Sequence, residues 1–78
     1  MTAATLALRD QLLAVLRDAE GFPTSTGDIA VGAGLRRHDP AAWRHLSALA
    51  RAGEVERVRV PGHYSVYWRL AGWATVAP

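Results

Sequence analysis

The stretch ALARAGEVERVRV, residues 48–60, contains a sharp change in residue pattern at Gly53. Before this glycine, alanines and leucines recur with the spacing of an amphipathic helix. After it, valines alternate with charged residues, as in a strand that buries one face. Arginines lie on both sides of the glycine. The stretch therefore predicts a helix that passes directly into a strand, with basic residues on both sides of the junction.

The sequence before this junction predicts two further helices. The first runs from about residue 4 to 19, because its main apolar residues form one stripe at helical spacing. The second runs from about Thr26 to Ala33, with Ser25 as N-cap and Asp28 as an acidic capping partner three residues later. Its two glycines, Gly27 and Gly32, each cost about 1 kcal/mol relative to alanine. Packing against the rest of the domain must therefore hold this short helix.

The third predicted helix, which ends at the Gly53 junction, has clear start and stop signals. Asp39 is a good N-cap, Pro40 fits the first helical position, and Gly53 follows the last turn. Helical spacing divides its side chains between two opposite faces. The face expected to be buried contains Ala42, Trp43, Leu46, Leu49 and Ala50, and the outward face contains Ala41, Arg44, Ala48 and Arg51.

A β-hairpin is predicted after the third helix. The segments 54–60 and 64–70 alternate in the manner of strands, and Pro61 and Gly62 supply a turn between them. Strict alternation places Val58 and Val60 of the first segment, with Val66, Trp68 and Leu70 of the second, on an apolar face. The opposite face then contains Arg57, Arg59, Tyr67 and Arg69.

Composition excludes several classes of protein. A chain of 78 residues fits one domain. A domain this small buries only about 60% of its unfolded surface, which leaves little core in which to form a deep enzyme pocket. Cysteine is absent, which leaves no disulfide framework or thiolate metal site. The first residues lack the basic start of a signal peptide, and no apolar run approaches the ~20 residues of a membrane span. We expect a soluble, cytoplasmic protein with no membrane partner.

Charge is unevenly distributed along the chain. All nine basic residues are arginine, which together with abundant alanine is typical of a GC-rich genome such as that of an actinobacterium or its phage. Residues 1–35 contain two arginines and four acidic residues, whereas residues 36–78 contain seven arginines and three acidic residues. A positive half of this kind is the electrostatic pattern expected of a nucleic-acid-binding protein.

The segments WRHLSALARAGEVERV and YSVYWRL resemble the winged helix-turn-helix superfamily, in particular its small bacterial or phage regulators. The resemblance covers about residues 6–70. It implies an α+β fold, with three helices followed by a two-stranded β-hairpin wing in a domain of residues 1–70, and residues 71–78 as a C-terminal tail. It also implies that the third helix is the recognition helix of a transcriptional regulator or a phage or plasmid accessory protein that binds double-stranded DNA.

Candidate DNA contacts follow from the outward face of this third helix. Ala41 and Ala48 leave room for close approach to the major groove, and Arg44 can donate two hydrogen bonds to a guanine. These three residues are the predicted base contacts. The predicted contacts to the DNA backbone are Arg36, Arg37, His45, Ser47, Arg51, Arg57, Arg59 and His63. The alternative for the arginines is an ordinary solvated face, whose exposed ion pairs contribute about 0 to 1 kcal/mol each.

Other chemistries have little support in the sequence. His38, His45 and His63 lack the spacing of zinc ligands. No serine has the sequence context of a catalytic nucleophile. We therefore predict no metal site, no catalytic residue, no cofactor and no small-molecule ligand. Trp43 and Trp68 fall on the inward stripes and are expected in the core rather than as stacking platforms for bases.

The sequence is also consistent with a protein partner and with a homodimer. Some winged helices bind only proteins, so a protein-interaction module in a larger assembly is the alternative function. A homodimer through the first helix and the tail is also consistent with the apolar residues left outside the core, which are Leu6, Leu13, Trp73 and Val76. In the competing arrangement, the tail folds back over the first helix within one chain. A dimer on DNA would require a palindromic operator with half-sites ~34 Å apart.

Overall fold

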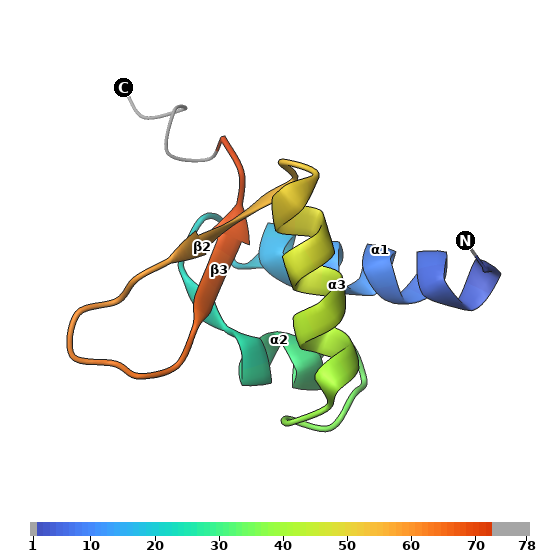
Figure 1. Cartoon of the computed structure of the whole chain (residues 1–78), viewed down its shortest axis with the longest axis horizontal. Coiled ribbons are helices and arrows are strands. Elements are labelled where there is room, and N and C mark those ends of the chain that lie inside the picture. Colours follow the sequence, from blue (N-terminus) through green and yellow to red (C-terminus); the bar gives the residue numbers. More distant parts are fainter. Residues whose placement is uncertain (1, 73–78) are drawn as a thin grey trace.

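The computed structural model describes residues 2–72, which form three helices and three strands (Figure 1). In chain order these are α1 (Ala3–Asp18), β1 (Thr24–Ser25), α2 (Thr26–Gly32), α3 (Pro40–Arg51), β2 (Val55–Val58) and β3 (Tyr67–Leu70). The predicted order of three helices followed by a hairpin is confirmed.

The predicted start signals of α2 and α3 and the glycine after α3 are also observed, and the other ends of α1 and α2 lie one residue from the prediction. The Ser25 hydroxyl accepts a hydrogen bond from the Asp28 backbone N–H at the start of α2, and the Asp39 carboxylate accepts one from the Ala41 N–H at the start of α3. Gly53 has a φ of +80°, which is the left-handed conformation that a glycine adopts at low cost after a helix. The chain therefore leaves α3 and enters β2 within a few residues.

The sheet differs from the predicted two-stranded hairpin. It has three antiparallel strands in the order β1–β3–β2, because Thr24 and Ser25 pair with Trp68 and Tyr67. A strand of two residues is too short to produce a recognisable alternation in the sequence. The extra strand ties the segment between α1 and α2 to the hairpin.

The register of the hairpin also corrects the predicted faces. Arg57 pairs with Trp68 and Val58 pairs with Tyr67, and directly paired residues in an antiparallel sheet lie on the same face. Arg57 is therefore on the face of Trp68, and Val58 is on the face of Tyr67, which is the reverse of the prediction. The buried residue that sets this register is Val55, which is 2% exposed.

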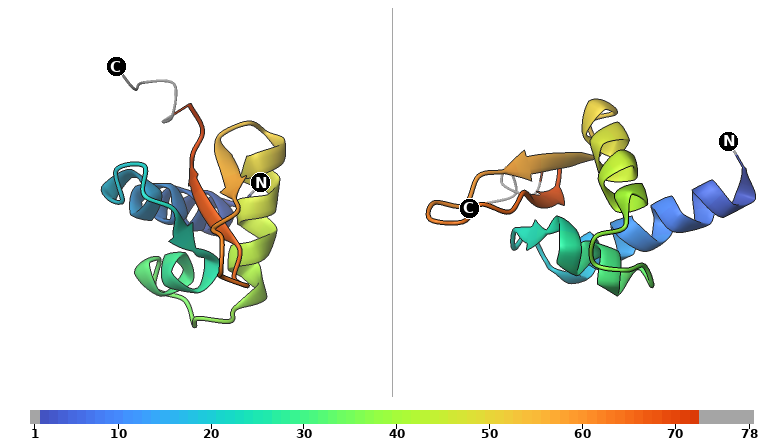
Figure 2. Two further views of the ribbon diagram at one scale, coloured as in Figure 1. Left: turned by 90° about the vertical axis from the view of Figure 1, so that its left-hand side faces the viewer. Right: turned by 60° about the horizontal axis from the view of Figure 1, so that its bottom comes forward.

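The core lies where α1, α2 and α3 meet one face of this sheet (Figures 1 and 2). Its largest fully buried side chain is Trp68, whose indole N–H donates to the Thr26 hydroxyl at 2.7 Å. The Thr26 hydroxyl in turn donates to the Val66 carbonyl at 3.1 Å. The other buried apolar residues are Leu12, Leu16, Ile29, Ala30, Ala33, Ala42, Leu46, Leu49 and Val55.

Gly32 shows why α2 contains residues that weaken a helix. A Cβ atom at this position would lie 2.9 Å from Cγ2 of Val15, so the glycine allows α1 and α2 to approach closely. The predicted cost of the glycine is therefore accompanied by a packing contact that a larger residue would prevent.

Candidate nucleic-acid interface

The exposed side of α3 is a row of small and basic side chains. Ala42, Leu46 and Leu49 turn toward the core, so residues on the opposite side of the helix face outward. Arg44, Ala48 and Arg51 are exposed, and Ser47 is half-buried beside them. We call these four residues the α3 ridge. Within residues 2–72, neither of its arginines makes an ion pair, so both guanidinium groups are available for another partner.

Two predicted contact residues lie at the edge of the α3 ridge rather than on it. Ala41 is half-buried next to the Asp39 cap, and His45 is half-buried on the flank of the helix.

Trp43 is more exposed than predicted. Its side chain lies on the flank of α3 nearest the hairpin and is 41% exposed. One part of the ring packs against Trp68 in a T-shaped contact, with centroids 5.6 Å apart and planes at 74°. The prediction that Trp43 belongs to the core is therefore wrong, and the residue only packs against the buried Trp68 from the surface.

Arg57 bridges the hairpin and α3. Its guanidinium carbon lies 5.1 Å from the centroid of the Trp43 ring and 5.9 Å from the nearest ring centroid of Trp68. A cation over an aromatic face at a partly exposed site contributes about 0.5–1 kcal/mol. The register of β2, rather than the alternation read from the sequence, brings this arginine to the tryptophans.

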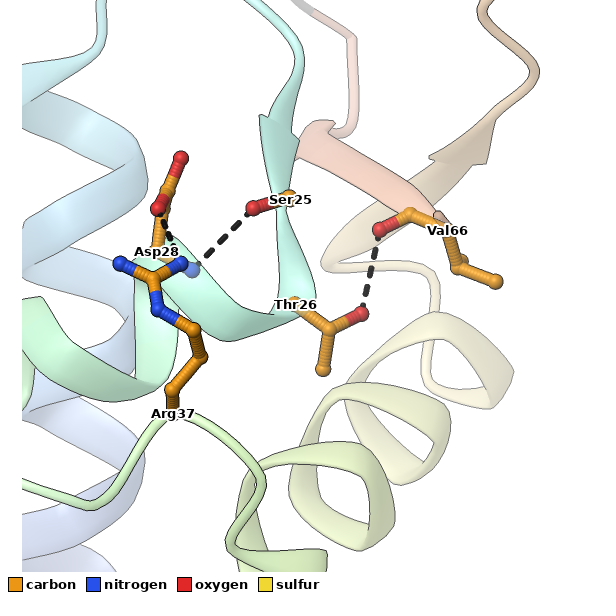
Figure 3. A network of polar contacts seen from close by, with 5 residues as sticks. All are labelled: Ser25, Thr26, Asp28, Arg37 and Val66. Carbon is orange, nitrogen blue, oxygen red and sulfur yellow. Dashed lines mark hydrogen bonds and ion pairs between the residues drawn. The ribbon is translucent and has the colours of Figure 1, made fainter. Parts of the chain in front are cut away.

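The loop between α2 and α3 contains two adjacent arginines with different surroundings. Arg36 is exposed and makes no ion pair among the described residues. Arg37 donates from Nη1 to Oδ1 of Asp28 at 2.6 Å (Figure 3). This hydrogen bond, followed by one with the Ser25 side chain, lowers the pKa of Asp28 below its ordinary value of 3.8. The sequence predicted the same role for both arginines, whereas the structure separates them.

The hairpin loop is longer than the predicted turn. The strands end at Val58 and resume at Tyr67, so residues 59–66 form the loop, with the predicted turn closed by a hydrogen bond from the His63 N–H to the Val60 carbonyl at 3.1 Å. Arg59 is exposed in this loop. The loop projects away from the three helices, on the side of the molecule opposite the N-terminus of α1 (Figures 1 and 2).

Two aromatic residues of the hairpin were absent from the predicted contacts. Tyr64 is fully exposed in the loop. Tyr67 lies at the base of the loop, where its hydroxyl and Nδ1 of His63 are 3.2 Å apart. His63 is therefore braced against the strand, and Tyr64 extends freely beside it. An aromatic residue immediately after a Pro-Gly turn was the available signal for Tyr64.

Other arginines have acidic partners elsewhere on the molecule. Arg9 of α1 pairs with Glu54, and Arg69 of β3 pairs with Glu56. Among the described residues, the basic side chains without such a partner lie mainly on the α3 ridge, in the loop before it and in the hairpin loop. The same residues include no group of three metal-ligating side chains and no helix long and apolar enough to cross a membrane.

Comparison with known proteins identifies the fold. No protein-family model matches the chain, and no curated protein sequence matches it either. A solved structure that does match is the Zalpha domain of PKZ from Carassius auratus, which was determined in complex with Z-DNA. The match has a TM-score of 0.69 and 22% sequence identity, and it covers 87% of this chain and 98% of that domain. The protein therefore has the α+β winged helix fold, in which the β2–β3 hairpin is the wing.

Proposed function

We propose that the protein binds double-stranded DNA with the α3 ridge in the major groove and the wing against the adjacent backbone. The observation that carries this proposal is the α3 ridge itself. Arg44 and Arg51 have no acidic partner among the described residues, and Ala48 leaves the surface between them low. A helix with a low, basic outer face fits the major groove, where arginine can read guanine through O6 and N7.

The roles of the other residues follow from their positions relative to the ridge. Arg44 and Ala48 contact bases, with Ala41 at the edge of the contact. Arg36, Ser47 and Arg51 contact phosphates next to the groove, and His45 reaches a phosphate on the flank. Arg59 and His63 contact the backbone through the wing. Binding of this kind suits a transcriptional regulator or a phage or plasmid accessory protein.

A duplex-binding experiment tests the proposal. The protein is first selected against a random duplex pool, and its affinity for the recovered sequence is then measured by fluorescence anisotropy at several salt concentrations. Because binding to phosphates releases counterions, the logarithm of the affinity should fall linearly with the logarithm of the salt concentration. If no duplex binds at low salt, the protein is instead the protein-interaction module that the winged helix fold also allows.

The form of the DNA is a second question, because the matching domain was solved in complex with Z-DNA. At 22% identity the match establishes the fold alone. A duplex of alternating cytosine and guanine provides the test, since circular dichroism distinguishes its right-handed and left-handed forms. Conversion of this duplex to the left-handed form by the protein would favour Z-DNA as the target. An unchanged spectrum with bound protein would favour the right-handed duplex.

A further inference from the structure

The side chain of Arg37 crosses from the loop before α3 to α2. Its guanidinium binds Asp28, and the two side chains are 53% and 59% exposed, so the contact lies at the surface (Figure 3). Arg37 also lines a groove of about 310 Å³ with residues from the starts of α2 and α3 and from the wing. The contact therefore lies beside the surface proposed to bind DNA.

Gly27 provides the path for this side chain. A Cβ atom on Gly27 would lie 2.8 Å from Cγ of Arg37 and 3.1 Å from its Nη1. The arginine stem therefore runs directly over the backbone of α2, in space that any other residue at position 27 would occupy. This contact gives Gly27 a packing role, as the contact with Val15 does for Gly32.

The contact with Arg37 places a positive charge next to the negative charge of Asp28. An ionised carboxylate near the starts of α2 and α3 repels the phosphates of an approaching duplex. The guanidinium of Arg37 compensates this charge, and it also holds the loop that leads into α3 against α2. Arg36, the adjacent residue, is exposed and makes no ion pair within residues 2–72.

We infer that Arg37 is a positioning residue that compensates Asp28 and fixes the loop before α3, while Arg36 is the arginine of this loop that binds phosphate. The role in DNA binding rests on the proposed function. The contact between Arg37 and Asp28 does not, so the two parts are tested separately.

The first experiment uses the free protein. The Asp28 carboxyl is titrated by NMR in the wild type and in the variants Arg37→Ala, Gly27→Ala and Arg36→Ala. We expect the Asp28 pKa to lie below 3.8 in the wild type, to rise in Arg37→Ala and Gly27→Ala, and to stay at the wild-type value in Arg36→Ala. The same pKa in the wild type and in Arg37→Ala would overturn the inference.

The second experiment measures duplex affinity against salt for Arg36→Ala, Arg37→Ala and the double variant Arg37→Ala/Asp28→Asn. Loss of one phosphate contact lowers the salt slope by about 0.9. We expect this smaller slope for Arg36→Ala. Arg37→Ala should bind several-fold more weakly with the wild-type slope, because Asp28 is left uncompensated, and the double variant should recover most of the loss.

Two results of the second experiment would contradict the positioning role. A salt slope reduced by about 0.9 in Arg37→Ala, with no recovery in the double variant, would make Arg37 a phosphate ligand. Wild-type affinity and slope in Arg37→Ala would show that the contact has no effect on binding. If the wild type itself binds no duplex, the proposed function fails, and the NMR titration still decides whether Arg37 holds Asp28.

Discussion

Arg44 and Arg51 lie on the same side of α3, about two helical turns apart, and this separation gives them different expected roles. Arg44 is in the N-terminal half of the helix, and its neighbours one turn away on the helix surface, Ala41 and Ala48, are small, so it can reach base edges. Arg51 is the last residue of the helix, where phosphate is the nearer partner. Both side chains are exposed, so neither substitution by alanine should affect folding.

We therefore expect Arg44→Ala to lower specific affinity by about 1–3 kcal/mol and to relax base preference at one position of the site. Arg51→Ala, the matched control on the same helix, should weaken binding to all sequences alike. Binding selection with each variant measures both effects. Unchanged affinity and base preference in Arg44→Ala would mean that the α3 ridge does not read the major groove.

Tyr64 gives a second prediction at the scale of single residues. Its side chain is fully exposed in the wing loop, and a tyrosine hydroxyl can donate to a phosphate. We expect Tyr64→Ala and Tyr64→Phe to weaken duplex binding equally, by about 1.5–3 kcal/mol, as for a lost hydrogen bond to a charged group. Anisotropy gives the affinities, and a thermal melt should show no change. A loss in Tyr64→Ala alone would assign the contact to the ring instead of the hydroxyl.

At the scale of the elements, α3 was the most predictable part of the chain. Asp39, Pro40 and Gly53 mark its ends, and its apolar spacing identifies the buried face. Leu46 lies at the centre of that face and is fully buried. We expect Leu46→Ala to lower the free energy of unfolding by about 2–5 kcal/mol, through lost burial and a cavity.

Chemical denaturation of Leu46→Ala measures this loss, and Ala48→Ser on the exposed side of the same helix is the control. A domain of this size has a total stability of only about 5–15 kcal/mol, so the effect should be large compared with that total. Wild-type stability in Leu46→Ala would be incompatible with the register of α3 in the structure.

The wing and the α2–α3 loop were less predictable than α3, for reasons that concern individual residues. In the segment 54–60, Val55 is out of phase with Val58 and Val60, and the alternation of the latter two gave the wrong face. The burial of Val55 decides that Arg57 lies with the tryptophans. Strand β1 has only two residues, and its pairing with β3 depends on the tertiary fold. Arg36 and Arg37 are adjacent arginines in the sequence, and only the position of Asp28 across Gly27 gives them different surroundings.

At the scale of the whole molecule, the exposed apolar residue of α1 lies away from the α3 ridge and the wing. Most arginines without an ion pair among residues 2–72 lie on the α3 ridge, in the loop before it and in the wing, whereas Leu6, 46% exposed, lies on the N-terminal half of α1, which projects from the opposite end (Figure 1). Leu13, the other apolar residue outside the predicted stripe, packs against the core. Trp73 and Val76, which the dimer hypothesis also uses, lie outside the described residues.

A dimer on the N-terminal half of α1 could therefore form without blocking α3. With Leu13 packed in the core, Leu6 is the main large apolar side chain that α1 exposes, and one such residue is too little surface for a stable interface by itself. We therefore expect the free protein to sediment as a monomer at tens of micromolar, both as the full chain and without residues 71–78. The number of protein copies bound per DNA site decides between a dimer and a monomer on DNA. Cooperative binding of two copies to a palindromic site with half-sites ~34 Å apart would support the dimer. Loss of cooperative binding in Leu6→Ala would place the dimer interface on α1. One copy on an asymmetric site would exclude it.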